Sequence, residues 1–135
     1  IVKRAMYGCQ LSSGVRLLEP MYVCDITVPN SACSGVYQCL NARRSAVESK
    51  EDRVGTPLCK IKAFVPVLES FGFTSHLRQL TSGQAFPQLA FSHWQILEGD
   101  PLDESSQAHT IVMDIRKRKG LKDTMPTWGD FYDKM

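Results

Sequence analysis

A regular alternation of apolar and polar side chains runs through residues 58–67 and predicts a half-buried β-strand. The side chains expected to face the core are Cys59, Ile61, Ala63 and Val65, and those expected to face away are Lys60, Lys62 and Phe64. Pro66 places the end of this strand at an edge of a sheet or at an exit from it. A strand with one apolar face needs a second layer to cover that face.

The segment before this strand predicts a strand followed by a helix. Residues 21–28 alternate in the same way, with an inward face made by Tyr22, Cys24, Ile26 and Val28. Residues 29–31 stop this strand and offer helix caps, and apolar residues then recur at helical spacing at Cys33, Val36, Tyr37 and Leu40. Beyond the helix we expect a short strand that begins at Ala46 and Val47, with a charged continuation over residues 48–53 that ends in a solvated hairpin loop.

A second helix and a last strand follow the strand at 58–67. The helix is expected to begin near Ser70, to bury Phe73, Leu77 and Leu80, and to stop at Gly83. Residues 86–91 then predict a strand with Leu89 and Phe91 turned inward.

The order strand, helix, strand, strand, helix, strand is that of the split βαβ, ferredoxin-like fold. We therefore predict an α+β domain over residues 20–94, with a four-stranded antiparallel sheet and two helices on one of its faces. Lys60 and Lys62 would lie on the other, open face. The expected core comprises Cys24, Ile26, Val36, Leu40, Ile61, Ala63, Phe73, Leu77, Leu80, Leu89 and Phe91.

Two further segments flank this domain. Residues 1–19 suggest a strand over 5–18 with a turn at 12–14, and residues 95–135 suggest a helical tail. The tail helix is expected to begin near Asp103 and to end at Gly120, with an apolar stripe made by Ala108, Ile111, Val112 and Ile115. Trp128, Phe131 and Tyr132 are expected to dock the last residues onto another surface.

Charge and cysteine content narrow the class of protein. The formal net charge is only +2, so any nucleic-acid signal has to come from local clustering. The five cysteines form no Cys-x-x-Cys pair and are expected to be small, reduced core residues, which favours a cytoplasmic or nuclear protein. No apolar stretch reaches membrane-spanning length. Because the chain opens with Ile1 and no leader, we expect it to be a piece of a longer protein.

Motifs for catalysis and for cofactors are absent from the sequence. There is no Gly-x-x-x-x-Gly-Lys-Ser/Thr loop, so the chain alone is not expected to bind GTP. His76, His93 and His109 are far apart and match no metal-ligand spacing, which favours surface or capping roles. No local signature of a nucleophile occurs. We expect no catalytic residue, cofactor, metal or small-molecule substrate in this chain.

The strongest charge cluster is Arg116, Lys117, Arg118 and Lys119. It has two interpretations: a solvated helix end that complements the helix dipole, or a contact with RNA phosphates. An RNA-binding sheet would need several outward aromatic side chains, and the strand at 58–67 offers only Phe64. The candidate contacts are therefore the four cations of this run, with Lys60 and Lys62 as further candidates.

Several runs resemble the translational GTPases of the elongation factor G and elongation factor 2 family, and most closely its eukaryotic elongation factor 2 branch. They are Leu18-Glu19-Pro20, Gly55-Thr56-Pro57, Glu69-Ser70-Phe71-Gly72-Phe73-Thr74, Leu77-Arg78, Ser82-Gly83-Gln84-Ala85-Phe86-Pro87-Gln88, His93-Trp94, Gly99-Asp100-Pro101, Arg116-Lys117-Arg118-Lys119-Gly120 and Asp133-Lys134-Met135. They keep the family's order and approximate spacing and cover essentially the whole chain.

The resemblance implies a module rather than an enzyme. Residues 20–94 would be the last ferredoxin-like domain of the factor, residues 1–19 the closing strand of the preceding domain, and residues 95–135 the C-terminal tail. GTP and Mg would belong to an N-terminal domain outside this chain, and the diphthamide histidine to the preceding domain. The implied partners are that preceding domain and the ribosome, through its RNA and large-subunit proteins.

Some positions depart from the family's pattern. Arg44-Ser45 stands where the family usually has Arg-Gly, Ala46 where it has His or Gln, and Ser92 where it has Asp before His-Trp. The serine resembles a related GTPase of large-subunit maturation, and a spliceosomal relative shares much of the pattern. An interaction module of such a GTPase, or a free-standing ferredoxin-like domain, is therefore an alternative.

Overall fold

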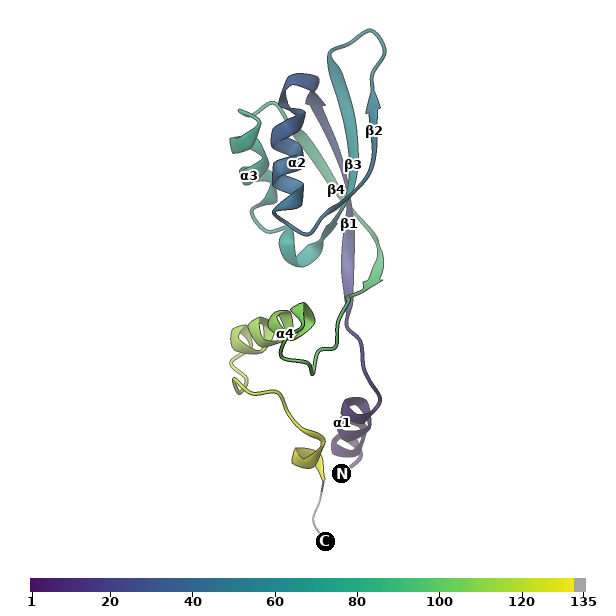
Figure 1. Cartoon of the computed structure of the whole chain (residues 1–135), viewed down its shortest axis with the longest axis vertical. Helices are drawn as coiled ribbons and strands as arrows, with labels where there is room; N and C mark the ends of the chain where they lie inside the picture. The colour runs from purple at the N-terminus through teal and green to yellow at the C-terminus, as the bar shows by residue number, and fades with distance from the viewer. Residues whose placement is uncertain (133–135) are drawn as a thin grey trace. The chain divides into compact units, whose positions relative to one another are not determined.

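The structure is a computed structural model that describes residues 1–132, and it divides into two compact units. One unit comprises residues 19–95, and the other joins residues 1–18 to residues 96–135. The elements of the first unit are β1 (Leu18–Pro29), α2 (Cys33–Asn41), β2 (Ala46–Asp52), β3 (Leu58–Pro66), α3 (Phe73–Leu80) and β4 (Phe86–Ile96) (Figure 1). Short 3-10 turns, η1 (Asn30–Ala32) and η2 (Val67–Glu69), precede the two helices.

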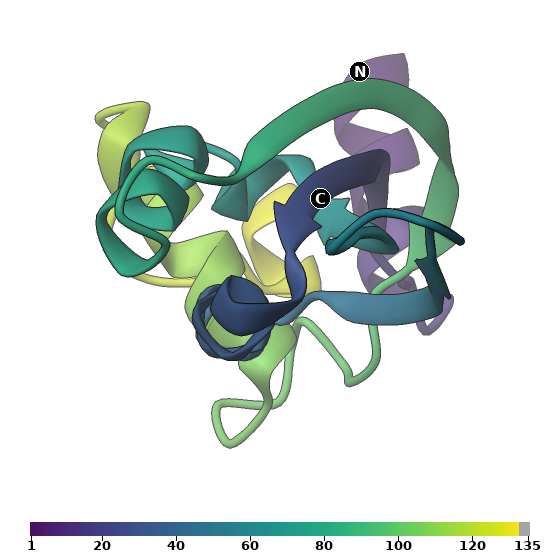
Figure 2. The same cartoon turned by 90° about the horizontal axis from the view of Figure 1, so that it is seen from above.

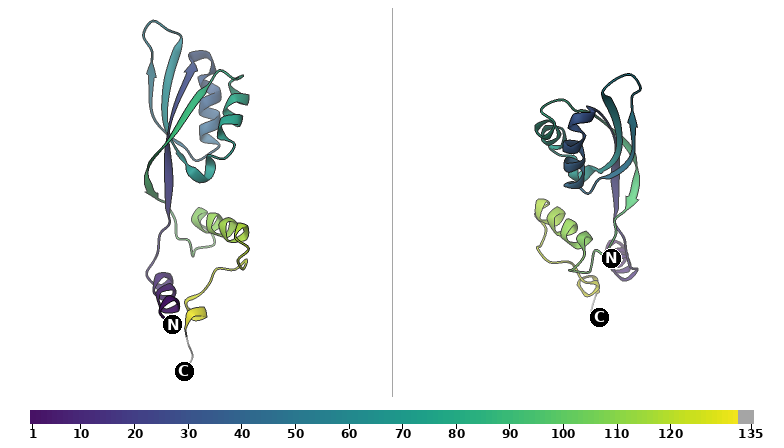
Figure 3. Two further views of the ribbon diagram at one scale, coloured as in Figure 1. Left: turned by 180° about the vertical axis from the view of Figure 1, so that it is seen from behind. Right: turned by 45° about the horizontal axis from the view of Figure 1, so that its top comes forward.

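The strands form one antiparallel sheet in the order β2-β3-β1-β4. At its centre, Ile26 of β1 lies opposite Ile61 of β3, and Cys24 lies opposite Ala63. These side chains are buried because α2 and α3 cover that face of the sheet (Figure 3). The ferredoxin-like α+β fold predicted from the sequence is confirmed.

The two helices approach each other closely at one glycine. A Cβ atom added to Gly35 of α2 would lie 2.5 Å from the carbonyl oxygen of Leu80, the last residue of α3. Only a residue without a side chain lets the backbones come this near. The core then closes around the fully buried Val36, Leu40, Phe73 and Leu77.

The strand expected to begin at Ala46 and Val47 is confirmed as β2. β2 runs on from Ala46 to Asp52 and pairs with β3, with an irregularity between Val47 and Ser49. It is an edge strand, so it gains backbone pairing on one side while its charged side chains stay in water. The charged continuation therefore belongs to the strand, and the hairpin turn to β3 follows Asp52.

Leu89 and Phe91, predicted to lie in the core, are exposed: 38% and 55% of their respective surfaces face solvent. β4 is the other edge strand, and none of its residues is buried, so its apolar side chains do not contribute to the core. It also extends to Ile96, five residues beyond the predicted end. Leu80, also predicted to be buried, is half-buried and packs against the core.

In the second unit, the strand predicted over 5–18 is wrong, because residues Val2–Ser12 form the helix α1. Its sequence is rich in good helix formers such as Ala5, Met6 and Gln10, which favour a helix. The residues described therefore contain four α-helices in all. The assignment of residues 1–19 to a preceding domain stays a prediction.

The tail helix is confirmed as α4 (Gln107–Arg118), although it begins four residues later than predicted. The side chain of Ser106 caps it by accepting a hydrogen bond from the backbone N–H of His109. Ala108 is buried, whereas Ile111, Val112 and Ile115 are half-buried.

The docking expected of the tail aromatics is seen for Phe131. It lies in the short turn η3 (Trp128–Phe131), with its ring centroid 5.7 Å from that of Tyr7 of α1. In the view from above, the ends of the chain are seen as the purple and yellow segments (Figure 2). The run Asp133-Lys134-Met135, part of the family resemblance, lies outside the described residues.

Candidate nucleic-acid interface

The basic run forms the last turn of α4 and its C-terminal cap. Arg116, Lys117 and Arg118 are the last helical residues, and Lys119 is the capping residue. Gly120 follows with φ 67°, and the N–H of Leu121 donates to the carbonyl of Arg116 over 3.0 Å. This glycine turn ends the helix abruptly, so the four cations are concentrated at one end of it.

The four cations differ in exposure. Arg116 is half-buried, and its Nε donates to the carbonyl of Lys122 over 3.3 Å. Lys117, Arg118 and Lys119 are exposed. Within residues 1–132, none of the four lies in an ion pair, so no carboxylate of the described chain neutralises them. Their charge remains available to an external anion.

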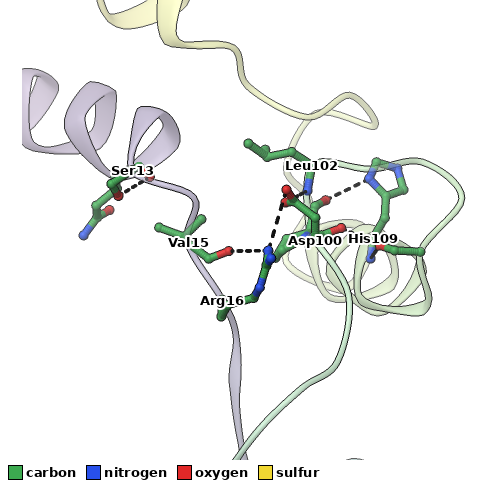
Figure 4. A network of polar contacts seen from close by, with 9 residues as sticks. Ser13, Val15, Arg16, Asp100, Leu102 and His109 are labelled. Atoms are coloured by element: carbon green, nitrogen blue, oxygen red, sulfur yellow. Dashed lines mark hydrogen bonds and ion pairs between the residues drawn. The ribbon is translucent and has the colours of Figure 1, made fainter.

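A polar network fixes the start of the same helix. Arg16 Nη1 lies 3.6 Å from Asp100 Oδ2, and the other oxygen of Asp100 accepts from the N–H of Leu102 over 2.9 Å (Figure 4). The ring nitrogen Nδ1 of His109 lies 3.0 Å from the carbonyl oxygen of Pro101. The contacts of Asp100 and Pro101 thus fix the loop that precedes α4. The basic run lies at the opposite, C-terminal end of this helix.

Lys60 and Lys62 are placed on the open face of the sheet, as predicted, but each has a carboxylate partner. Lys60 Nζ lies 3.1 Å from Asp25 Oδ2 of β1, and Lys62 Nζ lies 2.8 Å from Glu48 Oε2 of β2. The hydrogen bond to Glu48 raises the pKa of Lys62. Because carboxylates already compensate the charges of both lysines, the open face offers less positive charge than the two lysines alone suggest.

Reading the strand at 58–67 alone missed further aromatic side chains around the sheet. The ring of His93 lies edge-on to Phe64, with centroids 5.2 Å apart, and Phe91 lies 6.2 Å from Trp94. Phe91 and Trp94 are exposed. The strand at 86–91 was predicted to end before His93 and Trp94. Extending it to Ile96, where β4 ends, would have added both aromatic side chains to the sheet. The structure does not bring any of these rings together with the basic run in one unit.

The histidines and cysteines are the remaining candidate site residues. Among the residues described, no three His, Cys, Asp or Glu side chains lie close enough to hold a metal ion. The Nδ1 atom of His76 lies 3.6 Å from Cys39 Sγ, and that of His93 lies 2.8 Å from Ser92 Oγ. Cys9 is exposed, contrary to the expectation that all five cysteines belong to the core, because it lies on α1, in which no residue is buried.

None of the helices in the described part of the chain combines the length and the apolar character that a membrane span requires. The family model for the elongation factor G C-terminus matches residues 16–105, about two thirds of the chain. The match includes the whole of the four-stranded sheet and its two covering helices. The chain therefore belongs to the elongation factor G C-terminal domain family, a module of translation elongation factors.

Proposed function

We propose that this chain is the C-terminal ribosome-docking module of a translation elongation GTPase, closest to eukaryotic elongation factor 2. The parent protein would move tRNA and mRNA through the ribosome at the expense of GTP, in the cytoplasm. Family membership and the motif runs along the chain support this parentage. The module would act as a binding surface between the preceding domain of the factor and the ribosome.

The observation that carries the docking role is the charge at the end of α4. Lys117, Arg118 and Lys119 are exposed and lack acidic partners within the described residues. A helix end needs far less positive charge to complement its dipole, which is equivalent to roughly half an elementary charge. Ribosomal RNA supplies the closely spaced phosphates that such a cluster would bind.

In this proposal the chain has no catalytic role. GTP and Mg would be held by another part of the parent, since the sequence here has no phosphate-binding loop. Titration of the purified chain with fluorescent GTP is expected to show no saturable binding. Saturation at micromolar nucleotide would contradict this part of the proposal.

Binding to purified large ribosomal subunits tests the docking role. Cys9 is exposed while the other four cysteines are buried, so a single maleimide dye can be placed at Cys9 for fluorescence anisotropy. The wild-type chain and the matched variant K60Q/K62Q are expected to bind, because Lys60 and Lys62 are already paired with carboxylates. The variant K117Q/R118Q/K119Q is expected to bind at least about tenfold more weakly.

The related GTPases of subunit maturation and of the spliceosome remain the alternative, on the basis of Ser92 and the shared motifs. The same labelled chain distinguishes them. Preferential binding to mature ribosomes supports the elongation factor, whereas preferential binding to precursor large subunits or to spliceosomal particles supports the alternative. Equal weak binding to all three would indicate a non-specific basic surface.

A further inference from the structure

Two buried thiols, those of Cys33 and Cys59, lie against each other in the ferredoxin-like unit. Their sulfur atoms are 2.8 Å apart, closer than non-bonded sulfurs usually lie. Cys33 is the first residue of α2 and Cys59 the second residue of β3, so the pair joins the helix layer to the sheet. Both elements begin at the same end of the unit (Figure 1).

We propose that Cys33 and Cys59 are a site of reversible oxidative modification, at which a peroxide converts the two thiols into a disulfide. The proposal is independent of ribosome docking, since neither residue belongs to the basic run. A disulfide needs a sulfur separation of about 2.05 Å. The sulfurs therefore need to move by less than an ångström in all, and the fold can remain unchanged around them.

The surroundings of the two thiols indicate the order of the reaction. Cys33 keeps 7% of its surface exposed and Cys59 only 1%. Burial, and then the hydrogen bond with Cys33, raises the pKa of Cys59 to about 11, so this thiol is protonated at neutral pH. Peroxide therefore reacts at Cys33 first, and Cys59 acts second.

The chemistry balances with peroxide as the only oxidant. Cys33 gives up its proton and its sulfur attacks one peroxide oxygen, the O–O bond breaks, and Cys33 becomes a sulfenic acid, while the departing hydroxide takes up the released proton to form water. Cys59 sulfur then attacks the sulfur of Cys33, the S–O bond breaks, and the departing hydroxide takes the proton of Cys59 to form water. In total two thiols lose two electrons and two protons, and hydrogen peroxide is reduced to two molecules of water.

The other cysteines serve as internal controls. Cys39 Sγ lies 3.6 Å from the ring nitrogen Nδ1 of His76, and within the described residues neither Cys24 nor Cys39 shares a hydrogen bond with another thiol. Cys9 is exposed and single, so its oxidation reports that peroxide has acted. The background variant C9S prevents disulfides between two copies of the chain.

The test treats the chain with hydrogen peroxide, blocks remaining thiols with maleimide in denaturant, and maps disulfides by mass spectrometry. Trypsin leaves Cys59 in the peptide 54–60, but Cys24, Cys33 and Cys39 share the peptide 17–43, so fragmentation of the linked pair must assign the partner. We expect a Cys33–Cys59 link in the wild type and in C9S. We expect none in C33S or C59S, and melting curves of these variants establish whether they are folded.

Two results separate success from failure. In the expected case the disulfide, which closes a loop between residues 26 positions apart, raises the Tm by at least about 5 °C, and dithiothreitol reverses the rise. The proposal is overturned if both thiols still react with maleimide after Cys9 is consumed. It is equally overturned if Cys59 is found linked to Cys24 or Cys39 instead.

Discussion

Arg44 and Glu19 form a two-pronged ion pair, in which Nη1 and Nη2 of the guanidinium each lie 3.3 Å from a different carboxylate oxygen. Nε of the same arginine lies 3.4 Å from Glu69, so one side chain joins the start of β1 to the turn before α3. Side chains of Arg44 and Glu19 are 23% and 17% exposed, so solvent screens the pair only in part.

Replacing Arg44 by alanine is expected to lower the free energy of unfolding by about 1–2 kcal/mol. Arg44 has φ 52°, a conformation that is costly for alanine as well, so the backbone strain is kept and the loss reports on the ion pairs. Urea unfolding of R44A, E19Q and the double variant measures it. Additive effects in the double variant would show that the pair contributes nothing.

Ser82 provides the complementary change, because it also has a positive φ, 51°, but an exposed side chain. The substitution Ser82→Gly removes the steric cost of this conformation. It is expected to stabilise the chain by about 0.5–1 kcal/mol, as seen by a higher urea midpoint with an unchanged slope. A lower midpoint would mean that the left-handed conformation is not adopted in solution.

Gly35 is expected to tolerate no side chain, although alanine is the better helix former by about 1 kcal/mol. Its Cβ would lie 2.5 Å from the Leu80 carbonyl oxygen, which is backbone and has little room to move. We expect Gly35→Ala to cost about 1–3 kcal/mol in thermal or urea unfolding. The neighbouring exposed Ser34 is the control, and Ser34→Ala is expected to change stability by less than about 0.5 kcal/mol. Equal effects of the two changes would contradict the close packing of α2 on α3.

A matched pair of aspartates tests the revised core. Ile61 is fully buried at the centre of the sheet, so Ile61→Asp places a charge among apolar side chains and is expected to cost about 4 kcal/mol or more. Phe91, which the sequence also assigned to the core, is 55% exposed, and Phe91→Asp is expected to cost at most about 1 kcal/mol. Circular dichroism melts compare the two. Similar losses would restore Phe91 to the core.

Hydrophobic alternation in the sequence is informative for the inner strands of the sheet and less so for its edges. Alternation located β1 and β3 correctly because each has neighbours on both sides and one buried face. It was less informative at the edges: the charged residues of β2 did not show where that strand ends, and the apolar residues of β4 remain in water. The residues of α1 were expected to form a strand, but they include several good helix formers and adopt a helix.

The candidate interface was predictable in part for a similar reason. The basic run stands out in the sequence because its four members are consecutive, and the structure adds that no described carboxylate neutralises them. The pairing of Lys62 with Glu48 was not predictable, because strand register cannot be read from composition. Ion pairs across strands require that register.

The central claim is that the basic end of α4 binds ribosomal RNA phosphates, and the salt dependence of ribosome binding tests it most directly. Binding of the labelled chain to large ribosomal subunits is measured over a series of potassium chloride concentrations, for the wild type and for R116Q/K117Q/R118Q/K119Q. Removing roughly four phosphate contacts is expected to flatten the slope of log affinity against log salt by roughly three units. An unchanged affinity and slope in the variant, with binding retained, would contradict the claim.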